Sequence, residues 1–182
     1  GLTYVSLRSL VSGTYDNMLA RYAREGAKAR GSKAVIYDLR GNVGGSDSWP
    51  RKWIQSFLGT QNSIETSMLY AQKNSALFAA ENSESLLPED EGTCFAREVH
   101  GTWYENDIPI IVLVDDHCGS SGEGAVQLLK TLDNVLIVGS NTAGYQLCGN
   151  ISTFTLPYTG IGVRFGSTLF LYGDRANVDH RG

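Results

Sequence analysis

The stretch IPIIVLVDDHCGSSGEGAVQLLK (108–130) decides the fold class of this chain. It begins with an apolar run that ends in two aspartates (108–116), and such a run is typical of a strand buried in a parallel sheet. Glycines and serines follow, and the segment 120–132 then carries apolar residues at helical spacing. A strand that turns directly into a helix indicates an α/β domain.

The rest of the chain repeats this order around further strands. KAVIYDLR (33–40) and NVLIVGS (134–140) are nearly continuous apolar runs, and both predict buried strands. The β-α-β-loop-α order indicates a mainly parallel sheet. Other elements are expected as follows: a strand at 2–8, a helix over 14–30, a helix that Ser48 caps and that runs through Phe57, and two or three antiparallel strands over the C-terminal 151–173.

The domain organisation is expected to be simple, with residues 1–182 forming one domain. Residues 60–107 fit the pattern least and are expected to be a variable insertion. Within them, 63–72 fits a strand and the acidic stretch 81–93 predicts a surface excursion. The chain opens at Gly1 without a basic leader and ends without an obvious stop, so we expect a fragment of a longer protein.

Composition and charge exclude several classes of function. The chain has 182 residues and a net charge of -4, which argues against nucleic acid as the main partner. No apolar run approaches the length of a membrane span. The three cysteines match no zinc spacing, and we expect them to be free or packed thiols. Because phosphate loops, metal-ligand clusters and dinucleotide fingerprints are also missing, neither a cofactor nor a metal is expected.

Ser120 allows two interpretations at the turn between strand and helix. With Glu123 it forms S-x-x-E, which is the pattern of a capping box. A serine at a sharp strand-to-helix turn can also be a nucleophile, because the first helical amides then point at the substrate. The Ser121 amide would donate to an oxyanion. The second donor would come from Gly44 or Gly45 in the glycine-rich loop GNVGGS.

Two motifs carry a resemblance to a known family. DLRGNVGGS (38–46) resembles the D-L-R-x-N-x-G-G motif of the C-terminal processing (tail-specific) serine peptidases. The block from Pro109 to Tyr145 is similar to the nucleophile block of that family, in which a buried strand leads to a serine three residues before a glutamate. The resemblance covers most of 1–59 and 108–182.

This resemblance implies both a fold and an activity. The fold would be a crotonase-like core of stacked ββα units. The activity would be that of a serine endopeptidase, which cleaves a peptide or unfolded protein through an acyl-enzyme on Ser120. It further implies a bacterial protein that is secreted or held at the cell surface.

The general base is missing from the expected position. One branch of the family uses a Ser-Lys dyad with the lysine in T-x-G-K, but this chain has Tyr145 where that lysine falls. Lys130 lies further along the same helix, roughly 15 Å away by helical rise. The Ser-Lys mechanism is therefore not expected.

The other branch resembles the tricorn protease core, which uses serine, histidine and glutamate. NVDHRG (177–182) is similar to the late segment of that core and places Asp179 at the carboxylate. The histidine of that branch lies N-terminal to the core, so we expect it upstream of Gly1. His180 is a possible base within the chain, whereas His117 is expected to be packed or solvated, and His100 lies in the unmatched segment.

Two rival functions stay open. A peptide-binding pseudo-peptidase would keep this fold without a working base, which the missing lysine favours and the retained Ser120 opposes. A crotonase-type acyl-CoA enzyme would share the paired-amide oxyanion hole, but it needs no serine at 120 and would require a basic nucleotide site. The sequence leaves the oligomeric state open.

Overall fold

The computed structural model describes residues 1–13, 15–82 and 88–173 of the chain. These residues form two compact units. Unit 1 contains Gly1–Thr66 and His100–Gln146, and unit 2 contains Ser67–Val99 together with residues 147–173. Most of the segment expected as an insertion therefore belongs to the second unit.

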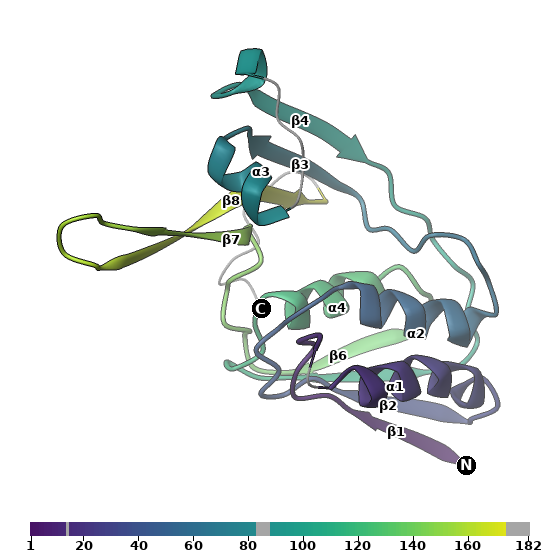
Figure 1. Cartoon of the computed structure of the whole chain (residues 1–182). Helices are drawn as coiled ribbons and strands as arrows, with labels where there is room; N and C mark the ends of the chain where they lie inside the picture. The colour runs from purple at the N-terminus through teal and green to yellow at the C-terminus, as the bar shows by residue number, and fades with distance from the viewer. Residues whose placement is uncertain (14, 83–87, 174–182) are drawn as a thin grey trace. The chain divides into compact units, whose positions relative to one another are not determined.

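Unit 1 is a parallel four-stranded sheet in the order β1-β2-β5-β6. Figure 1 shows its three helices on the same side of this sheet. The strands are β1 (Leu2–Ser6), β2 (Ala34–Asp38), β5 (Ile110–Val114) and β6 (Val135–Gly139), and the helices are α1 (Asp16–Ala29), α2 (Ser48–Leu58) and α4 (Ser121–Leu129). This architecture confirms the predicted α/β class and the mainly parallel sheet.

The core of unit 1 lies between the sheet and these helices. Tyr37 of β2 packs edge-on against Trp53 of α2, with ring centroids 5.0 Å apart. Trp53 in turn stacks on Phe57 at 5.2 Å. The two helices approach closely at Gly26, where a Cβ would lie 2.3 Å from the Trp53 carbonyl oxygen. Helix α1 therefore requires glycine at this position.

The prediction of buried strands was wrong in one respect, because only one face of these strands is buried. Along β2 and β5, fully buried residues alternate with partly buried ones, because the helices cover a single face of the sheet. The edge strand β6 is mostly exposed, with Leu136 at 60% and Val138 at 44%. A continuous apolar run alone does not reveal that the described helices cover only one face of the sheet.

Unit 2 is an antiparallel four-stranded sheet in the order β4-β3-β8-β7. Its strands are β3 (Met68–Lys73), β4 (Cys94–Val99), β7 (Cys148–Thr155) and β8 (Gly162–Tyr172), joined by the short helix α3 (Ala76–Asn82) and a 3₁₀ turn (Pro88–Asp90). The hairpin β7–β8 confirms the antiparallel strands predicted for the C-terminal part. Strand β4 lies within 60–107, where the sequence predicted an insertion, and it begins directly after the predicted surface excursion at 81–93.

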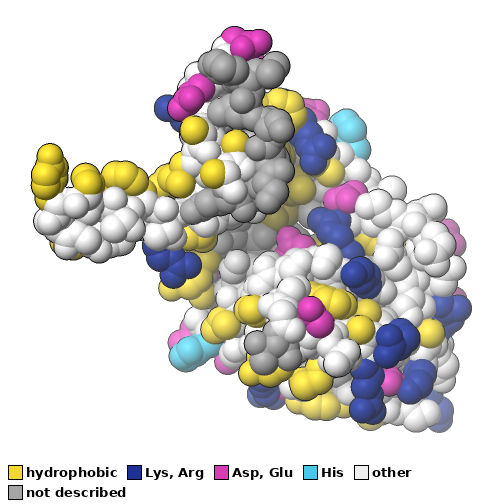
Figure 2. All heavy atoms as spheres, viewed as in Figure 1, with side chains coloured by type: hydrophobic (Ala, Val, Ile, Leu, Met, Phe, Trp, Pro, Cys, Tyr) yellow, Lys and Arg dark blue, Asp and Glu magenta, His cyan; other side chains and the backbone are white. Residues whose placement is uncertain are grey.

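The β7–β8 hairpin carries apolar side chains on one of its faces. Phe154 pairs with Val163, and Phe165 lies on the same face, because residues two apart along a strand point the same way. All three side chains are exposed, and Figure 2 shows hydrophobic side chains along this hairpin. None of the helices in the described part of the chain combines the length and apolarity needed to cross a membrane.

Candidate active site

The parallel sheet brings the glycine-rich loop and the Ser120 turn to the same edge. Strands β2 and β5 are paired in register, with Asp38 opposite Leu113, so the loops that follow them leave the sheet side by side. The Gly119 amide donates to the Asn42 carbonyl oxygen at 2.8 Å. A Cβ on Gly44 would lie 2.7 Å from the Ser120 Cβ. Only glycine allows the loop to come this close.

The Ser120 backbone adopts a conformation that side chains rarely take. Its φ is 53° and its ψ is -125°, and α4 begins at the next residue. Such geometry costs a non-glycine residue about 1–3 kcal/mol and is concentrated at functional sites. The serine is exposed, so its side chain is accessible. A strained, exposed serine at a helix start is the geometry of a presented nucleophile.

The buried carboxylate of Glu123 holds this turn in place. Oε2 accepts hydrogen bonds from the amides of Ser120 and Tyr145, each at 2.9 Å. Oε1 accepts from the Thr142 hydroxyl at 2.7 Å and from the Gly144 amide at 2.8 Å. Glu123 is only 5% exposed. It therefore ties the start of α4 to the loop 142–145, which is far more than the capping pattern predicts.

The amides expected at an oxyanion hole differ in availability. The Gly44 N–H donates to Asn42 Oδ1 at 2.9 Å and is thereby occupied. The N–H groups of Gly45 and Ser121 form no hydrogen bond within the part of the chain that the structure describes. The Ser121 hydroxyl donates to the Gly45 carbonyl oxygen at 2.9 Å and so links these two residues. The available pair is therefore Gly45 and Ser121.

Asn42 supports the loop from inside, although the sequence analysis assigned it no separate role. Its side chain is fully buried, and Nδ2 donates to the Leu7 carbonyl oxygen at 3.1 Å while Oδ1 accepts from Gly44. A Cβ on Gly122 would lie 2.7 Å from the Asn42 carbonyl oxygen. The asparagine of the quoted motif was the available signal, because a buried amide must satisfy several hydrogen bonds.

The aspartate and arginine of the motif brace the same loop. Asp38 is buried and accepts from Arg40 Nε at 2.9 Å and from the Tyr4 hydroxyl at 2.6 Å. The Arg40 hydrogen bond is the main reason why the pKa of Asp38 lies well below its usual range. On the other side of the loop, Asp115 Oδ1 accepts from the Gly41 amide at 2.8 Å. The beginning of the loop is thus fixed from two sides.

The candidate bases do not meet the serine in the described residues. His117 is 76% exposed, and its Nδ1 lies 2.7 Å from Asp116 Oδ1. Lys130 follows the last turn of α4, at the opposite end of the helix from Ser120. His100 is exposed just after β4. Tyr145 packs its ring on the turn, 2.9 Å from where a Cβ on Gly119 would lie.

The remaining two candidates, Asp179 and His180, lie outside the described residues. Within the described ranges, no histidine or lysine forms a hydrogen bond with Ser120. The roles of Asp179 and His180 therefore stay predictions.

Neither a cysteine nor a metal accounts for the site. Cys118 is buried, and burial raises the pKa of its thiol to about 12, so it stays protonated at neutral pH. Asp115, Asp116 and His117 place ligand atoms within 4.8 Å of one another. Asp115 Oδ1, however, already accepts two backbone amides, from Gly41 and His117. The cluster is better explained as a brace for the turn.

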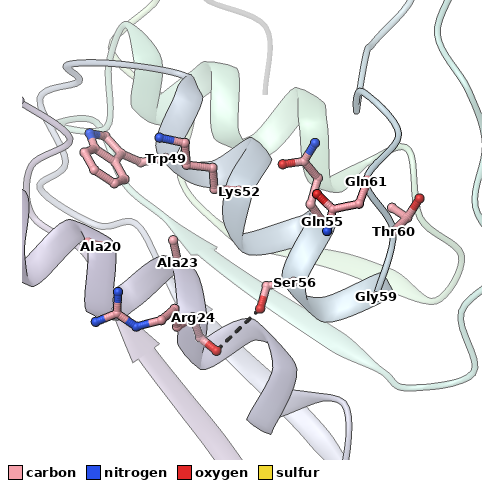
Figure 3. A pocket seen from close by; sticks show the side chains of 10 residues that line it. All are labelled: Ala20, Ala23, Arg24, Trp49, Lys52, Gln55, Ser56, Gly59, Thr60 and Gln61. Carbon is pink, nitrogen blue, oxygen red and sulfur yellow. Dashed lines mark hydrogen bonds between the residues drawn. The ribbon is translucent and has the colours of Figure 1, made fainter.

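A separate hollow of about 520 Å³ lies between α1 and α2 (Figure 3). Its lining includes Arg24, Lys52 and Trp49, with the Lys52 ammonium 4.5 Å from the Trp49 ring. None of the site residues discussed above lines this hollow. It is therefore distinct from the Ser120 turn.

A comparison with models of protein families shows which family this chain belongs to. The model of peptidase family S41 matches residues 1–177. The chain belongs to peptidase family S41. The motifs around Asp38 and Ser120 therefore reflect true family membership, and the α/β fold with its parallel and antiparallel sheets fits the crotonase-like core. No curated protein matches the chain.

Solved structures support the fold of this S41 chain. A candidate peptidase from Parabacteroides merdae matches with a TM-score of 0.59 and 23% identity, over 98% of this chain and 51% of that one. A lipoprotein from Streptococcus agalactiae matches with a TM-score of 0.55 and 19% identity, over 96% of this chain and 57% of the lipoprotein. The photosystem II D1 C-terminal processing protease matches with a TM-score of 0.56 and 17% identity, over 97% of this chain and 39% of the protease. The chain therefore spans only about half the length of these structures.

Proposed function

We propose that this chain is the core of a serine endopeptidase and that Ser120 is its nucleophile. The observation that carries the proposal is the strained Ser120 backbone, with φ 53° and ψ -125°, packed against the Gly44–Gly45 loop. A capping serine needs no such strain. The family membership agrees, because peptidase family S41 matches nearly the whole chain.

The chemistry would follow from this arrangement. Ser120 Oγ attacks the carbonyl carbon of the scissile peptide bond, and the oxygen becomes an oxyanion that the N–H groups of Gly45 and Ser121 stabilise. The C–N bond then breaks, the amine leaves with a proton, and water hydrolyses the ester on Ser120. Glu123 would keep the turn rigid during both steps through its four hydrogen bonds.

The proton acceptor is a further part of the proposal. Tyr145 stands where the Ser-Lys branch has lysine, so we favour a histidine supplied by another part of a longer protein, as in the tricorn-like branch, with Asp179 as its carboxylate partner. His180 is the alternative base within the chain. The substrate would be a peptide or unfolded protein, and the location a bacterial surface or the secreted fraction, in line with the streptococcal lipoprotein of similar fold.

An inactive peptide-binding protein is the second candidate. It is favoured by the lack of a histidine or lysine bonded to Ser120 within the described residues. A fluorophosphonate probe separates the two functions, because only an activated serine is labelled rapidly. We expect slow labelling of this chain alone and rapid labelling within a longer protein that supplies the base. Ser120→Ala should abolish the labelling, and the half-buried control Ser9→Ala should retain it. A chain that stays unlabelled at every pH, both alone and within a longer protein, would support the inactive alternative.

A further inference from the structure

Asp47 occupies the capping position of α2 without capping the helix. An aspartate there ordinarily accepts an amide of the first turn, but the Asp47 side chain makes no such hydrogen bond. The Ser48 amide donates to Ser46 Oγ at 3.3 Å instead. The prediction that Ser48 caps this helix was also wrong, because Ser48 is already its first helical residue. The Asp47 carboxylate is therefore available for another role.

The Asp47 carboxylate packs against the first turn of α4. Its Oδ1 lies 2.6 Å from where a Cβ on Gly124 would be, so glycine makes room for it. The same oxygen is buried and has no hydrogen-bond partner. A buried polar atom without a partner is rare in folded proteins and requires an explanation.

Ser121 connects this carboxyl group to the glycine-rich loop. The Ser121 hydroxyl donates to the Gly45 carbonyl oxygen. Ser121 also lies in the first turn of α4, against which the Asp47 carboxylate packs, and its hydroxyl lowers the pKa of Asp47. A hydroxyl has one proton to donate and two lone pairs that accept. It can therefore serve the Gly45 carbonyl or an ionised Asp47 carboxylate, but not both at full strength. A protonated Asp47 instead donates to Ser121 and leaves the bond to Gly45 intact.

The surroundings favour the protonated form of Asp47. Burial is the main cause that raises its pKa; the Ser121 hydroxyl and then the charge of Arg51 oppose the rise, and Glu65 adds to it. Arg51 is already paired with Glu65, at 2.7 Å. From α4, Asp47 is faced by Ser121 and Gly124, neither of which carries a charge.

We propose that Asp47 is a positioning residue, which acts through Ser121 and fixes the Gly45 loop to the start of α4 when it carries a proton. The chain of hydrogen bonds then runs from Asp47 to Ser121 and on to the Gly45 carbonyl oxygen. Because Gly45 and Ser121 are the two residues with available amides, this tether sets the spacing of the oxyanion donors. Ionisation of Asp47 draws the Ser121 proton away and loosens the loop. The catalytic consequence rests on the proposed function, whereas the tether does not.

The test combines amide hydrogen exchange with Ser120 labelling across a pH series. Two amides report on the loop. The Leu10 amide donates to the Gly44 carbonyl oxygen at 2.8 Å, and the Ser46 amide donates to the Leu10 carbonyl oxygen at 2.9 Å. In the native chain, we expect their protection, corrected for intrinsic exchange, to fall about fivefold as Asp47 ionises, which is the effect of one hydrogen bond. Asp47→Asn should stay protected at every pH, because its amide donates to Ser121 without titrating. Ser121→Ala should be weakly protected throughout.

Asp47→Ser is the second neutral variant and guards against a folding defect in Asp47→Asn. The same pH dependence in both neutral variants as in the native chain would overturn the tether, and so would full protection in Ser121→Ala. Fluorophosphonate labelling should follow the protection. If protection behaves as expected but Ser120 never reacts, the tether stands and the peptidase proposal fails. If labelling varies with pH while protection is flat in the native chain, the tether fails and the peptidase proposal stands.

Discussion

Two carboxyl groups pack against the first turn of α4, and their surroundings are opposite. Glu123 accepts four hydrogen bonds, from two amides of the loop 142–145, the Thr142 hydroxyl and the Ser120 amide. Asp47 has a buried oxygen with no partner, and burial raises its pKa. A carboxylate with four donors is a fixed anchor. A buried carboxyl group with an unpaired oxygen is stabilised by taking up a proton. The turn around Ser120 thus combines a permanent support with one that responds to pH.

The largest effect is expected from removing the anchor. Glu123→Ala leaves four donors around a buried cavity, and we expect a loss of about 3–5 kcal/mol in the free energy of unfolding. Urea denaturation measures this. Asp116→Asn is the control, because the Asp116 side chain is 77% exposed and its loss should change stability very little. Equal stabilities for the two variants would remove Glu123 from its role as anchor.

Gly44→Ala should come next, because it forces the loop away from the serine. The new Cβ would lie 2.7 Å from the Ser120 Cβ at a φ of +102°. Gly92→Ala is a matched control with a φ of +80° and no atom within 4 Å, so it introduces backbone strain alone. We expect Gly44→Ala to be less stable than this control by about 1–3 kcal/mol, the usual cost of overpacking. Only Gly44→Ala should slow the labelling of Ser120.

Substitution of Ser120 should change the stability less than Gly44→Ala does, but it should abolish the reaction completely. Alanine and glycine both remove the nucleophile, so hydrolysis and labelling should vanish in both variants. Glycine tolerates φ 53° and ψ -125°, whereas alanine retains the strain. Thermal unfolding should therefore show Ser120→Gly to be more stable than Ser120→Ala by about 1 kcal/mol. If the order is reversed, the strain at Ser120 is not what the backbone angles indicate.

The smallest effect should come from the titration of Asp47. A raised folded-state pKa contributes stability that is complete below the unfolded pKa and is lost as pH rises through the folded pKa. Asp47→Asn has no such loss, so its advantage over the native chain should grow as pH rises through this window. Asp38 has a lowered pKa, and its contribution should be lost as pH falls. Relative to the native chain, Asp47→Asn should therefore gain stability as pH rises, whereas Asp38→Asn should lose it. Urea denaturation of the native chain and both variants at about pH 3–7 measures these differences in the free energy of unfolding.

The sequence predicted part of this arrangement for clear physical reasons. Parallel strands place their following loops at one edge of the sheet, so the meeting of GNVGGS with Ser120 follows from the strand order. The full role of Glu123 could not be predicted, because its partners at 142–145 lie across a loop and a strand. The sequence suggested only the capping bond to the Ser120 amide.

Other features depend on packing that no local pattern encodes. The exposure of β6 follows from the helices covering one face of the sheet. The sheet of unit 2 pairs β3 with β8, about a hundred residues later in the chain, so this pairing could not be predicted from local alternation, and the strand β4 was missed. The sequence predicted Ser48 as the cap and assigned Asp47 no role, because nothing local shows that Gly124 leaves space for the Asp47 carboxylate beside α4.

The most direct test of the account is a crystal structure of the chain after reaction with a fluorophosphonate. The phosphoryl oxygen of such an adduct stands in for the oxyanion of the peptide reaction. We predict a covalent bond to Ser120 Oγ, with the phosphoryl oxygen accepting hydrogen bonds from the Gly45 and Ser121 amides at about 2.7–3.1 Å. An adduct on Ser121, or a phosphoryl oxygen that points away from both amides, would contradict the central claim that this turn is a serine peptidase site.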